Sequence, residues 1–93
     1  CLVVKLAAEV ADLSEDMRVV LDTGVQRLLE RIASLIEEAR EDGSLPAGKP
    51  SLALARVIYQ MWLGAALLAK LSQNKLPLVE ARDTTEQLLN CAA

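Results

Sequence analysis

The sequence predicts an all-α protein, an antiparallel bundle of about four helices. Apolar residues recur at spacings of three and four along the 93-residue chain, and no stretch alternates in the way that a strand requires. Two clear breaks and one softer break separate the helical segments. With 53% hydrophobic residues the chain can bury one modest core, so we treat residues 1–93 as a single domain.

The softer break, near Ser14, separates the first two helices. We expect the first helix over residues 2–12, with an apolar stripe of Leu2, Leu6, Val10 and Leu13. The Ser14 hydroxyl suits an N-cap, and Glu15 and Asp16 place negative charge in the first turn of the next helix. We expect that second helix to reach about Glu41. Its predicted apolar face comprises Met17, Leu21, Leu28, Leu35 and Ala39, widened by Val20, Ile32 and Ile36.

Residues 42–51 form the clearest loop, because they contain Gly43, Pro46, Gly48 and Pro50. We expect Ser51 to cap a third helix that ends near Ser72. Almost every position in 57–71 is apolar, and such a helix has to be covered on nearly all sides. Pro77 suits the first turn of a fourth helix, which ends near Asn90. Its predicted stripe is Leu78, Ala81, Thr85, Leu88 and Leu89.

Charge and hydropathy narrow the classes of partner. With 13 acidic and 10 basic residues, the net charge is −3, so we do not expect this piece of chain to bind DNA by itself. The chain starts without Met inside an expected helix, which predicts that an N-terminal part is missing. The longest apolar run, 61–69, is shorter than the roughly 18–20 residues of a membrane span, so we expect a cytoplasmic protein.

Catalytic and metal-binding patterns are absent from the sequence. The chain has no His, which removes His-based nucleophile activation and most zinc sites. Gly43 and Gly48 lack the Lys-Ser/Thr pair of a phosphate-binding loop. We therefore predict no enzyme, no catalytic residue, no metal site and no cofactor. The two cysteines, Cys1 and Cys91, are too few for a disulfide scaffold, and we interpret them as thiols.

Cys1 and Lys70 are the residues whose position favours chemistry. A thiol at a helix N-terminus is stabilised as the reactive thiolate by the helix dipole. Lys70 follows nine apolar residues: its ammonium either extends to water from a buried stem or is desolvated and partly neutral. A neutral amine could capture an oxidised cysteine as an S–N bond. The residues by themselves leave both interpretations open.

Two segments, CLVVKLAAEVADLSEDMR at 1–18 and YQMWLGAALLAK at 59–70, resemble the ligand-sensing half of TetR-family transcriptional repressors, in particular the NemR-type subfamily. The resemblance covers nearly the whole chain. It implies a homodimer in which the third and fourth helices form an intersubunit four-helix bundle, and operator DNA bound through an absent N-terminal domain. It also implies that Cys1 and Lys70 sense an oxidant or electrophile. Modification of these residues would then release DNA.

Tyr59 and Trp62 are the only aromatic residues, three positions apart on one helix. Packing in the core or in a dimer interface accounts for each, and the resemblance also places them beside an effector pocket. Because a short chain has few surfaces to cover its apolar helices, self-association is a physical expectation too. The predicted dimer interface comprises Tyr59, Trp62, Leu63, Ala66, Leu78, Ala81, Thr85 and Leu88.

Two alternative functions remain open from the sequence. The chain could be a helical homodimerisation module whose cysteines have no chemical role. It could also be a regulator domain that binds a small apolar ligand, with Cys1 only lining the pocket. Normal thiol reactivity at Cys1 favours the first alternative, and ligand stabilisation that survives Cys1→Ser favours the second.

Overall fold

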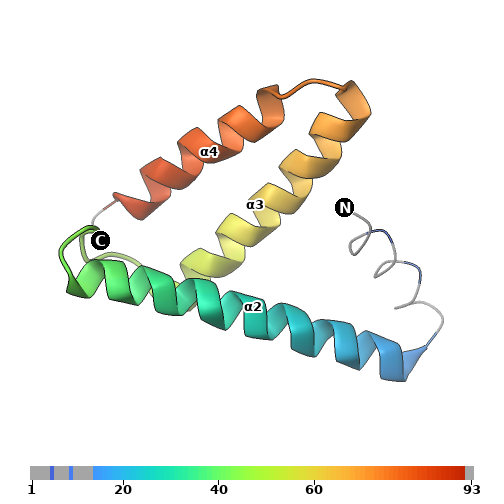
Figure 1. Cartoon of the computed structure of the whole chain (residues 1–93), viewed down its shortest axis with the longest axis horizontal. Helices are drawn as coiled ribbons and strands as arrows, with labels where there is room; N and C mark the ends of the chain where they lie inside the picture. Colours follow the sequence, from blue (N-terminus) through green and yellow to red (C-terminus); the bar gives the residue numbers. More distant parts are fainter. Residues whose placement is uncertain (1–4, 6–8, 10–13, 92–93) are drawn as a thin grey trace.

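The computed structural model describes residues 5, 9 and 14–91. In that part of the chain the regular elements are the helices α2 (Glu15–Glu41), α3 (Ser51–Ser72) and α4 (Leu76–Leu89), without a strand (Figure 1). The predicted all-α class is confirmed. Lys5 and Glu9 are helical, and the remainder of the helix expected over residues 2–12 lies outside the described residues.

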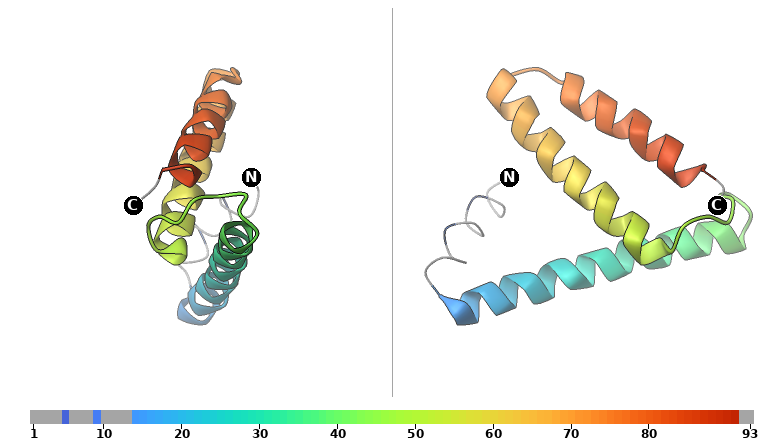
Figure 2. Two further views of the ribbon diagram at one scale, coloured as in Figure 1. Left: turned by 90° about the vertical axis from the view of Figure 1, so that its left-hand side faces the viewer. Right: turned by 180° about the vertical axis from the view of Figure 1, so that it is seen from behind.

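The helices form a thin, open arrangement. α3 begins against the second half of α2 and diverges from it, and α4 turns back to run beside α3 (Figures 1 and 2). The molecule measures 44 × 33 × 17 Å, so its smallest dimension is close to that of two packed helices. The first half of α2 and the far end of α3 therefore lie apart.

The start of α2 agrees with the sequence prediction. Ser14 has an extended backbone, and its side-chain oxygen accepts a hydrogen bond from the Met17 backbone N–H at 3.3 Å. Glu15 and Asp16 occupy the first turn, where their charge complements the exposed N–H groups. Ser14 is thus the N-cap of α2, as predicted, and the helix ends at Glu41, also as predicted.

A tight turn ends α2 and starts the predicted loop. Gly43 has a φ of +88°, which a residue with a Cβ adopts only with strain. The Asp42 carboxylate accepts hydrogen bonds from the Ser44 backbone N–H at 2.8 Å and from its hydroxyl at 2.5 Å. These contacts fix the direction in which the chain leaves the helix.

The predicted N-cap of α3 is wrong. Ser51 is the first residue inside α3, and the cap position belongs to Pro50, whose side chain makes no capping hydrogen bond. The Pro50 carbonyl accepts the first helical bond from the Leu54 N–H at 3.0 Å. Proline has the fixed φ that suits this boundary, so the helix starts without the help of the serine hydroxyl.

The boundary between α3 and α4 agrees with the prediction to within one residue. α3 ends at Ser72, followed by Gln73 in the left-handed conformation with a φ of 52°. The Asn74 side-chain oxygen accepts a hydrogen bond from the Leu76 N–H at 2.9 Å, and Pro77 lies in the first turn of α4. This short connection forces α4 to run back along α3.

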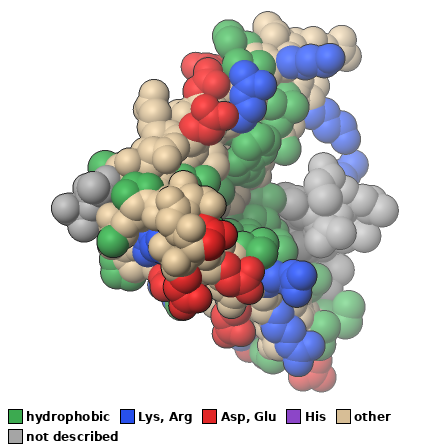
Figure 3. Space-filling view, turned by 60° about the vertical axis from the view of Figure 1, so that its left-hand side comes forward, with side chains coloured by type: hydrophobic (Ala, Val, Ile, Leu, Met, Phe, Trp, Pro, Cys, Tyr) green, Lys and Arg blue, Asp and Glu red, His purple; other side chains and the backbone are tan. Residues whose placement is uncertain are grey.

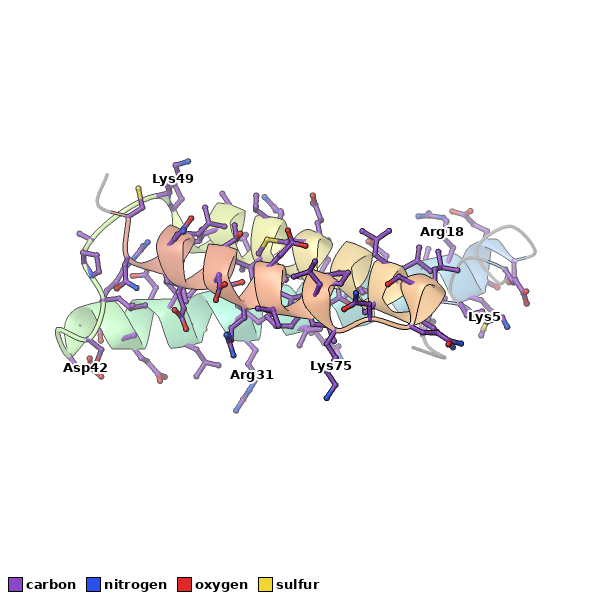
Figure 4. All side chains as sticks on the ribbon, turned by 90° about the horizontal axis from the view of Figure 1, so that it is seen from above. Lys5, Arg18, Arg31, Asp42, Lys49 and Lys75 are labelled. Atoms are coloured by element: carbon purple, nitrogen blue, oxygen red, sulfur yellow. The ribbon has the colours of Figure 1, made fainter. Side chains whose placement is uncertain are left out.

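The core lies where α2 and α3 meet. Ala33 and Ile36 from α2 pack with Leu54, Ala55 and Ile58 from α3, all at most 9% exposed. The half-buried side chains around this core cluster are Ile32, Leu52, Trp62, Leu88 and Leu89, so the last turns of α4 also reach it. Figure 4 shows labelled charged side chains such as Arg31, Lys49 and Lys75 pointing away from the helices.

The predicted apolar face of α2 is only partly correct. Ile36 is buried, as predicted, but the other buried residues are Leu29 and Ala33. Four residues of the predicted face are exposed in the chain: Met17 (47%), Val20 (64%), Leu28 (43%) and Leu35 (54%). The cause is that α3 meets α2 over its second half, from one side, whereas the apolar arc of α2 is wider than one helix can cover.

Candidate functional site

A groove of about 340 Å³ lies between α3 and α4. Its floor contains Ala65 and Ala81, which are 7% and 3% exposed, and small side chains there allow the two helices to approach closely. The other lining residues are Gln60, Met61, Gly64 and Leu68 from α3 and Pro77, Glu80 and Thr84 from α4. We call this surface the α3–α4 groove.

The two helices that form the groove also carry exposed apolar side chains, of which Leu68 lines the groove. The exposed apolar residues on α3 are Val57 (51%), Leu67 (59%), Leu68 (57%) and Leu71 (73%). Those on α4 are Leu76 (55%) and Val79 (39%). Figure 3 shows hydrophobic side chains gathered at the surface in the middle of the view. Within the single chain α3 is therefore not covered on nearly all sides, and its cover by a second subunit stays a prediction. A contiguous apolar surface of this kind marks an interaction site.

Gly64 occupies an open position in the groove. A Cβ built on it meets no atom of the described residues within 4 Å, and the same is true of Gly24 in α2. Small residues such as these often mark close helix contact, but no such contact is present at either glycine among the described residues. Since a glycine in a helix costs about 1 kcal/mol relative to alanine, contacts within the described chain do not account for Gly64.

Trp62 joins α3 to α4 outside the groove lining. Its indole Nε1–H donates a hydrogen bond to the Thr85 hydroxyl oxygen at 2.9 Å, and the Thr85 hydroxyl donates to the Ala81 carbonyl at 2.7 Å. Trp62 also packs against the core cluster. Tyr59, the other aromatic residue of the predicted pocket, is half-buried and does not line the groove.

The predicted interface residues are all at least half-buried within the single chain. Ala81 is buried within the single chain, so it has almost no surface left for a second subunit. The others are half-buried: Tyr59, Trp62, Leu63, Ala66, Leu78, Thr85 and Leu88. The stripe predicted for α4 is thereby confirmed as its packed face, since none of its residues is exposed.

Sequence reasoning missed the polar and apolar rim of the groove, namely Gln60, Met61, Leu68, Pro77, Glu80 and Thr84. One signal was available: on a helical wheel, Gln60, Gly64, Leu67, Leu68 and Leu71 share one side of α3, away from the side of Ile58 and Trp62. Choosing between these two apolar sides requires knowing where α2 and α4 pack.

Of the predicted sensing pair, only Lys70 can be placed. Cys1 lies outside the described residues. Lys70 is exposed in the last turn of α3, where its positive charge complements the helix C-terminus. This agrees with the expectation of an ammonium that extends to water. Cys91 follows α4 and is exposed.

The electrostatic features of the described residues are local. The Arg18 guanidinium, 2.6 Å from Glu15, lowers the pKa of that carboxyl group and has its own pKa raised by it. Hydrogen bonds from the Ser44 side chain and backbone lower the pKa of Asp42. Within residues 5, 9 and 14–91, no group of three His, Cys, Asp or Glu side chains is placed to hold a metal ion.

Residues 1–85 match the family model of the tetracyclin repressor-like C-terminal domain. The chain belongs to this family. It is 44% identical over 81 residues to the HTH-type transcriptional repressor NemR of Escherichia coli strain K12, a match that covers 87% of the chain and 41% of NemR. The NemR of Escherichia coli O6:H1 strain CFT073 matches with the same values. The predicted resemblance to TetR-family repressors is confirmed.

Solved structures of the TetR family have the same fold. A crystal structure of a TetR/AcrR family member matches with a TM-score of 0.86 and 53% identity, over 96% of this chain and 50% of that one. The reduced form of E. coli NemR matches with a TM-score of 0.88 and 42% identity, over 96% and 47% of the two chains. The present chain therefore spans about half the length of the TetR-family proteins that it matches.

By length and composition, α3 could cross a membrane, although only 22% of its most apolar window is buried inside the chain. The uninterrupted apolar run is shorter than a span, but the whole helix of 22 residues is apolar and carries few charged side chains. The core helix of a soluble protein can have the same length and composition. The membership of the TetR family favours the packing explanation.

Proposed function

We propose that this chain is the dimerisation and effector-sensing part of a TetR-like transcriptional repressor. The observation that carries the proposal is an uncovered apolar groove between the last two helices of a chain that belongs to this family. The most informative relative, E. coli NemR, is a transcriptional repressor. The protein acts in the cytoplasm, without a catalytic role, by controlling access to operator DNA.

The occupant of the α3–α4 groove is a second copy of the chain. Each buried leucine side chain stabilises an interface by about 1.5–3 kcal/mol, and α3 exposes several of them beside the groove. Packing the same helix pair against itself gives a four-helix arrangement with two-fold symmetry, the commonest symmetry of closed assemblies. The interface then centres on Gly64 and Leu68 and includes the half-buried predicted residues only at its edge.

Operator DNA is bound elsewhere in the protein. The net charge of −3 gives this chain no excess of cations for phosphate contacts. In this proposal a helix-turn-helix domain on the N-terminal side binds DNA, and the dimer of the present domain sets the distance between two such readers. A shift of a few ångströms between half-sites one DNA turn apart is sufficient to release the operator.

The dimer is tested by sedimentation equilibrium of the wild-type chain and of Gly64→Leu. Wild type sediments as a dimer, and the leucine, whose Cβ meets no described atom within 4 Å and whose longer side chain occupies the groove, weakens dimerisation at least tenfold. Gly24→Leu is the matched control, because it adds the same side chain at an open glycine in α2. A wild-type monomer, or equal dissociation constants for the two variants, contradicts the proposal.

Redox sensing by Cys1 and Lys70 is the finer part of the proposal. Hypochlorite chlorinates the Cys1 thiol and releases water, and the Lys70 amine then displaces chloride to form an S–N bond. Overall, the pair loses its thiol hydrogen and one amine hydrogen. Two facts support this step: Lys70 is exposed, so its ammonium can lose a proton to water and become the attacking amine, and a NemR structure is specified as the reduced form.

Mass spectrometry after mild hypochlorite treatment tests this pairing. We expect a Cys1–Lys70 crosslink in wild type and in Lys75→Arg, which removes another exposed lysine from the same end of α3, and no crosslink in Lys70→Arg. Oxidation of Cys1 to sulfinic acid in all three proteins, without a crosslink, contradicts the sensing role. That result leaves a dimerisation domain in which the thiol has no signalling function.

A further inference from the structure

Trp62 and Thr85 form a hydrogen bond between two helices that otherwise meet through apolar and small side chains. The donor and acceptor are 23 residues apart in sequence and 2.9 Å apart in space. The buried residues of this helix pair that line the groove are Ala65 and Ala81, whose side chains are too small to interlock. Small apolar contacts allow helices to slide or rotate, whereas a hydrogen bond has a defined length and direction.

The Thr85 hydroxyl is held in place by a second hydrogen bond. It donates to the Ala81 carbonyl one turn earlier at 2.7 Å, which fixes the side-chain rotamer and leaves the oxygen free to accept from the indole. Trp62 is fixed at the other end, because its ring packs against the core cluster of α2 and α3. The bond therefore ties α4 to the rigid part of the molecule.

Neither partner lines the α3–α4 groove, although Ala81, which accepts the second hydrogen bond, lies in its floor. Any change in the distance or angle between α3 and α4 alters the separation of the two groove walls, which carry Leu68 on one side and Pro77, Glu80 and Thr84 on the other. A bond outside the groove thus controls the shape of the groove.

We propose that Trp62 and Thr85 are a positioning pair: their hydrogen bond fixes α4 against α3 and holds the groove in the shape that accepts a second copy of the chain. This inference rests on the proposed dimerisation and names residues that control it from outside the groove lining. Losing the bond leaves a half-buried indole N–H without its acceptor, an arrangement that favours rearrangement of α4.

The experiment compares Thr85→Val with Thr85→Ser. Valine keeps the shape of threonine and removes the hydroxyl, whereas serine keeps the hydroxyl. The dimer dissociation constant is measured by sedimentation, far below the unfolding temperature. We expect it to be at least tenfold higher than wild type in Thr85→Val and within a few-fold of wild type in Thr85→Ser. Thr23→Val, at an exposed site on α2, is the control for the same substitution and leaves the constant unchanged.

Two further measurements separate positioning from a general loss of stability. Trp62 is the sole tryptophan, so a shift of its fluorescence in Thr85→Val shows that the bond is lost. Circular dichroism of the same variant shows whether the helices persist, and we expect that they do. Trp62→Phe removes the N–H from the opposite end. We expect the double variant Trp62→Phe/Thr85→Val to dimerise no more weakly than Trp62→Phe, because both act through one bond.

The possible outcomes are distinct. A wild-type dimer whose dissociation constant is unchanged by Thr85→Val overturns the positioning role and leaves the proposed function intact. Additive losses in the double variant also overturn it, because the two residues then act independently. A wild-type chain that sediments as a monomer overturns the proposed function, and the inference fails with it.

Discussion

The two ends of α3 differ in how completely the chain covers them. At its first half, α3 packs against α2 in a closed core, and Leu54 and Ala55 are 4% and 0% exposed. At its second half, Leu67, Leu68 and Leu71 remain more than half exposed beside an open groove, although α4 runs alongside. The first contact, the α2–α3 joint, is complete within one chain. The second, the α3–α4 arm, requires an additional partner to bury its apolar side chains.

This difference separates stability from assembly. Substitutions in the α2–α3 joint change the free energy of unfolding, because its side chains are already buried. Substitutions on the exposed side of the α3–α4 arm change self-association and leave the single chain folded. Each prediction below breaks or sharpens that comparison.

The largest effect is expected at a buried position of α2. Leu29→Ala removes a side chain that is 5% exposed, and we expect it to lower the free energy of unfolding by about 2–5 kcal/mol. The neighbouring Leu28→Ala is the matched control: Leu28 is 43% exposed, and we expect a change below about 0.5 kcal/mol. Urea unfolding measures both. Equal losses contradict the assignment of the buried face of α2.

The next effect is expected on the α3–α4 arm. Leu68→Lys places a charge on a residue that is 57% exposed in the chain and lines the groove. We expect the dimer to weaken by more than tenfold, because burying an unpaired ammonium is unfavourable. Circular dichroism of the dissociated chain is expected to match that of wild type. Loss of helix in this variant indicates that Leu68 supports the fold of the single chain.

A smaller effect on stability is expected at the N-terminal ends of the helices, where it distinguishes α2 from α3. Ser14→Ala removes the hydroxyl that accepts from the Met17 N–H, and we expect a loss of about 1 kcal/mol. Ser51→Ala removes a hydroxyl that makes no capping bond, and we expect almost no loss. Thermal unfolding of the two variants side by side measures the difference. If Ser51→Ala lowers the stability as much as Ser14→Ala does, Ser51 is the N-cap of α3 after all, in contradiction to the structure.

The smallest effect concerns the ion pair at the start of α2, far from both contacts. Arg18 lowers the pKa of Glu15, so the pair stabilises the folded state above the ordinary carboxyl pKa, and this contribution is lost as the pH falls through the lowered value. NMR titration of the Glu15 carboxyl carbon in wild type and Arg18→Gln tests the assignment. We expect the pKa to rise in the variant, and an unchanged pKa contradicts the pairing.

Much of the fold followed from the sequence, because helix boundaries depend on local chemistry. Ser14 followed by acidic residues, the Gly43 turn and Pro77 each act within a few residues of their own position, and each boundary was predicted to within a residue or so. Ser51 is the exception. Proline at the preceding position already satisfies the geometry of the helix start, so the serine pattern carried no information there.

The faces of the helices were harder to predict, because they depend on which helices meet. The predicted α2 face contains Leu28, whereas the buried leucine is its neighbour Leu29. Both positions belong to one wide apolar arc, and the direction of approach of α3 decides between them. The groove was missed for the same reason. Leu68 and Trp62 are apolar residues on different sides of α3, and the sequence does not indicate which side packs inside the chain and which stays exposed.

The two methionines provide the most direct test of the central claim, that a second copy of the chain covers the α3–α4 arm and leaves the exposed side of α2 open. Met61 lines the groove, and Met17, 47% exposed, lies on α2. Peroxide converts both to sulfoxides, and mass spectrometry gives the two rates across protein concentrations. We predict that Met61 oxidises more slowly as the dimer forms, that Met17 does not, and that Gly64→Leu removes the protection. Equal, concentration-independent rates at both methionines in wild type contradict the account.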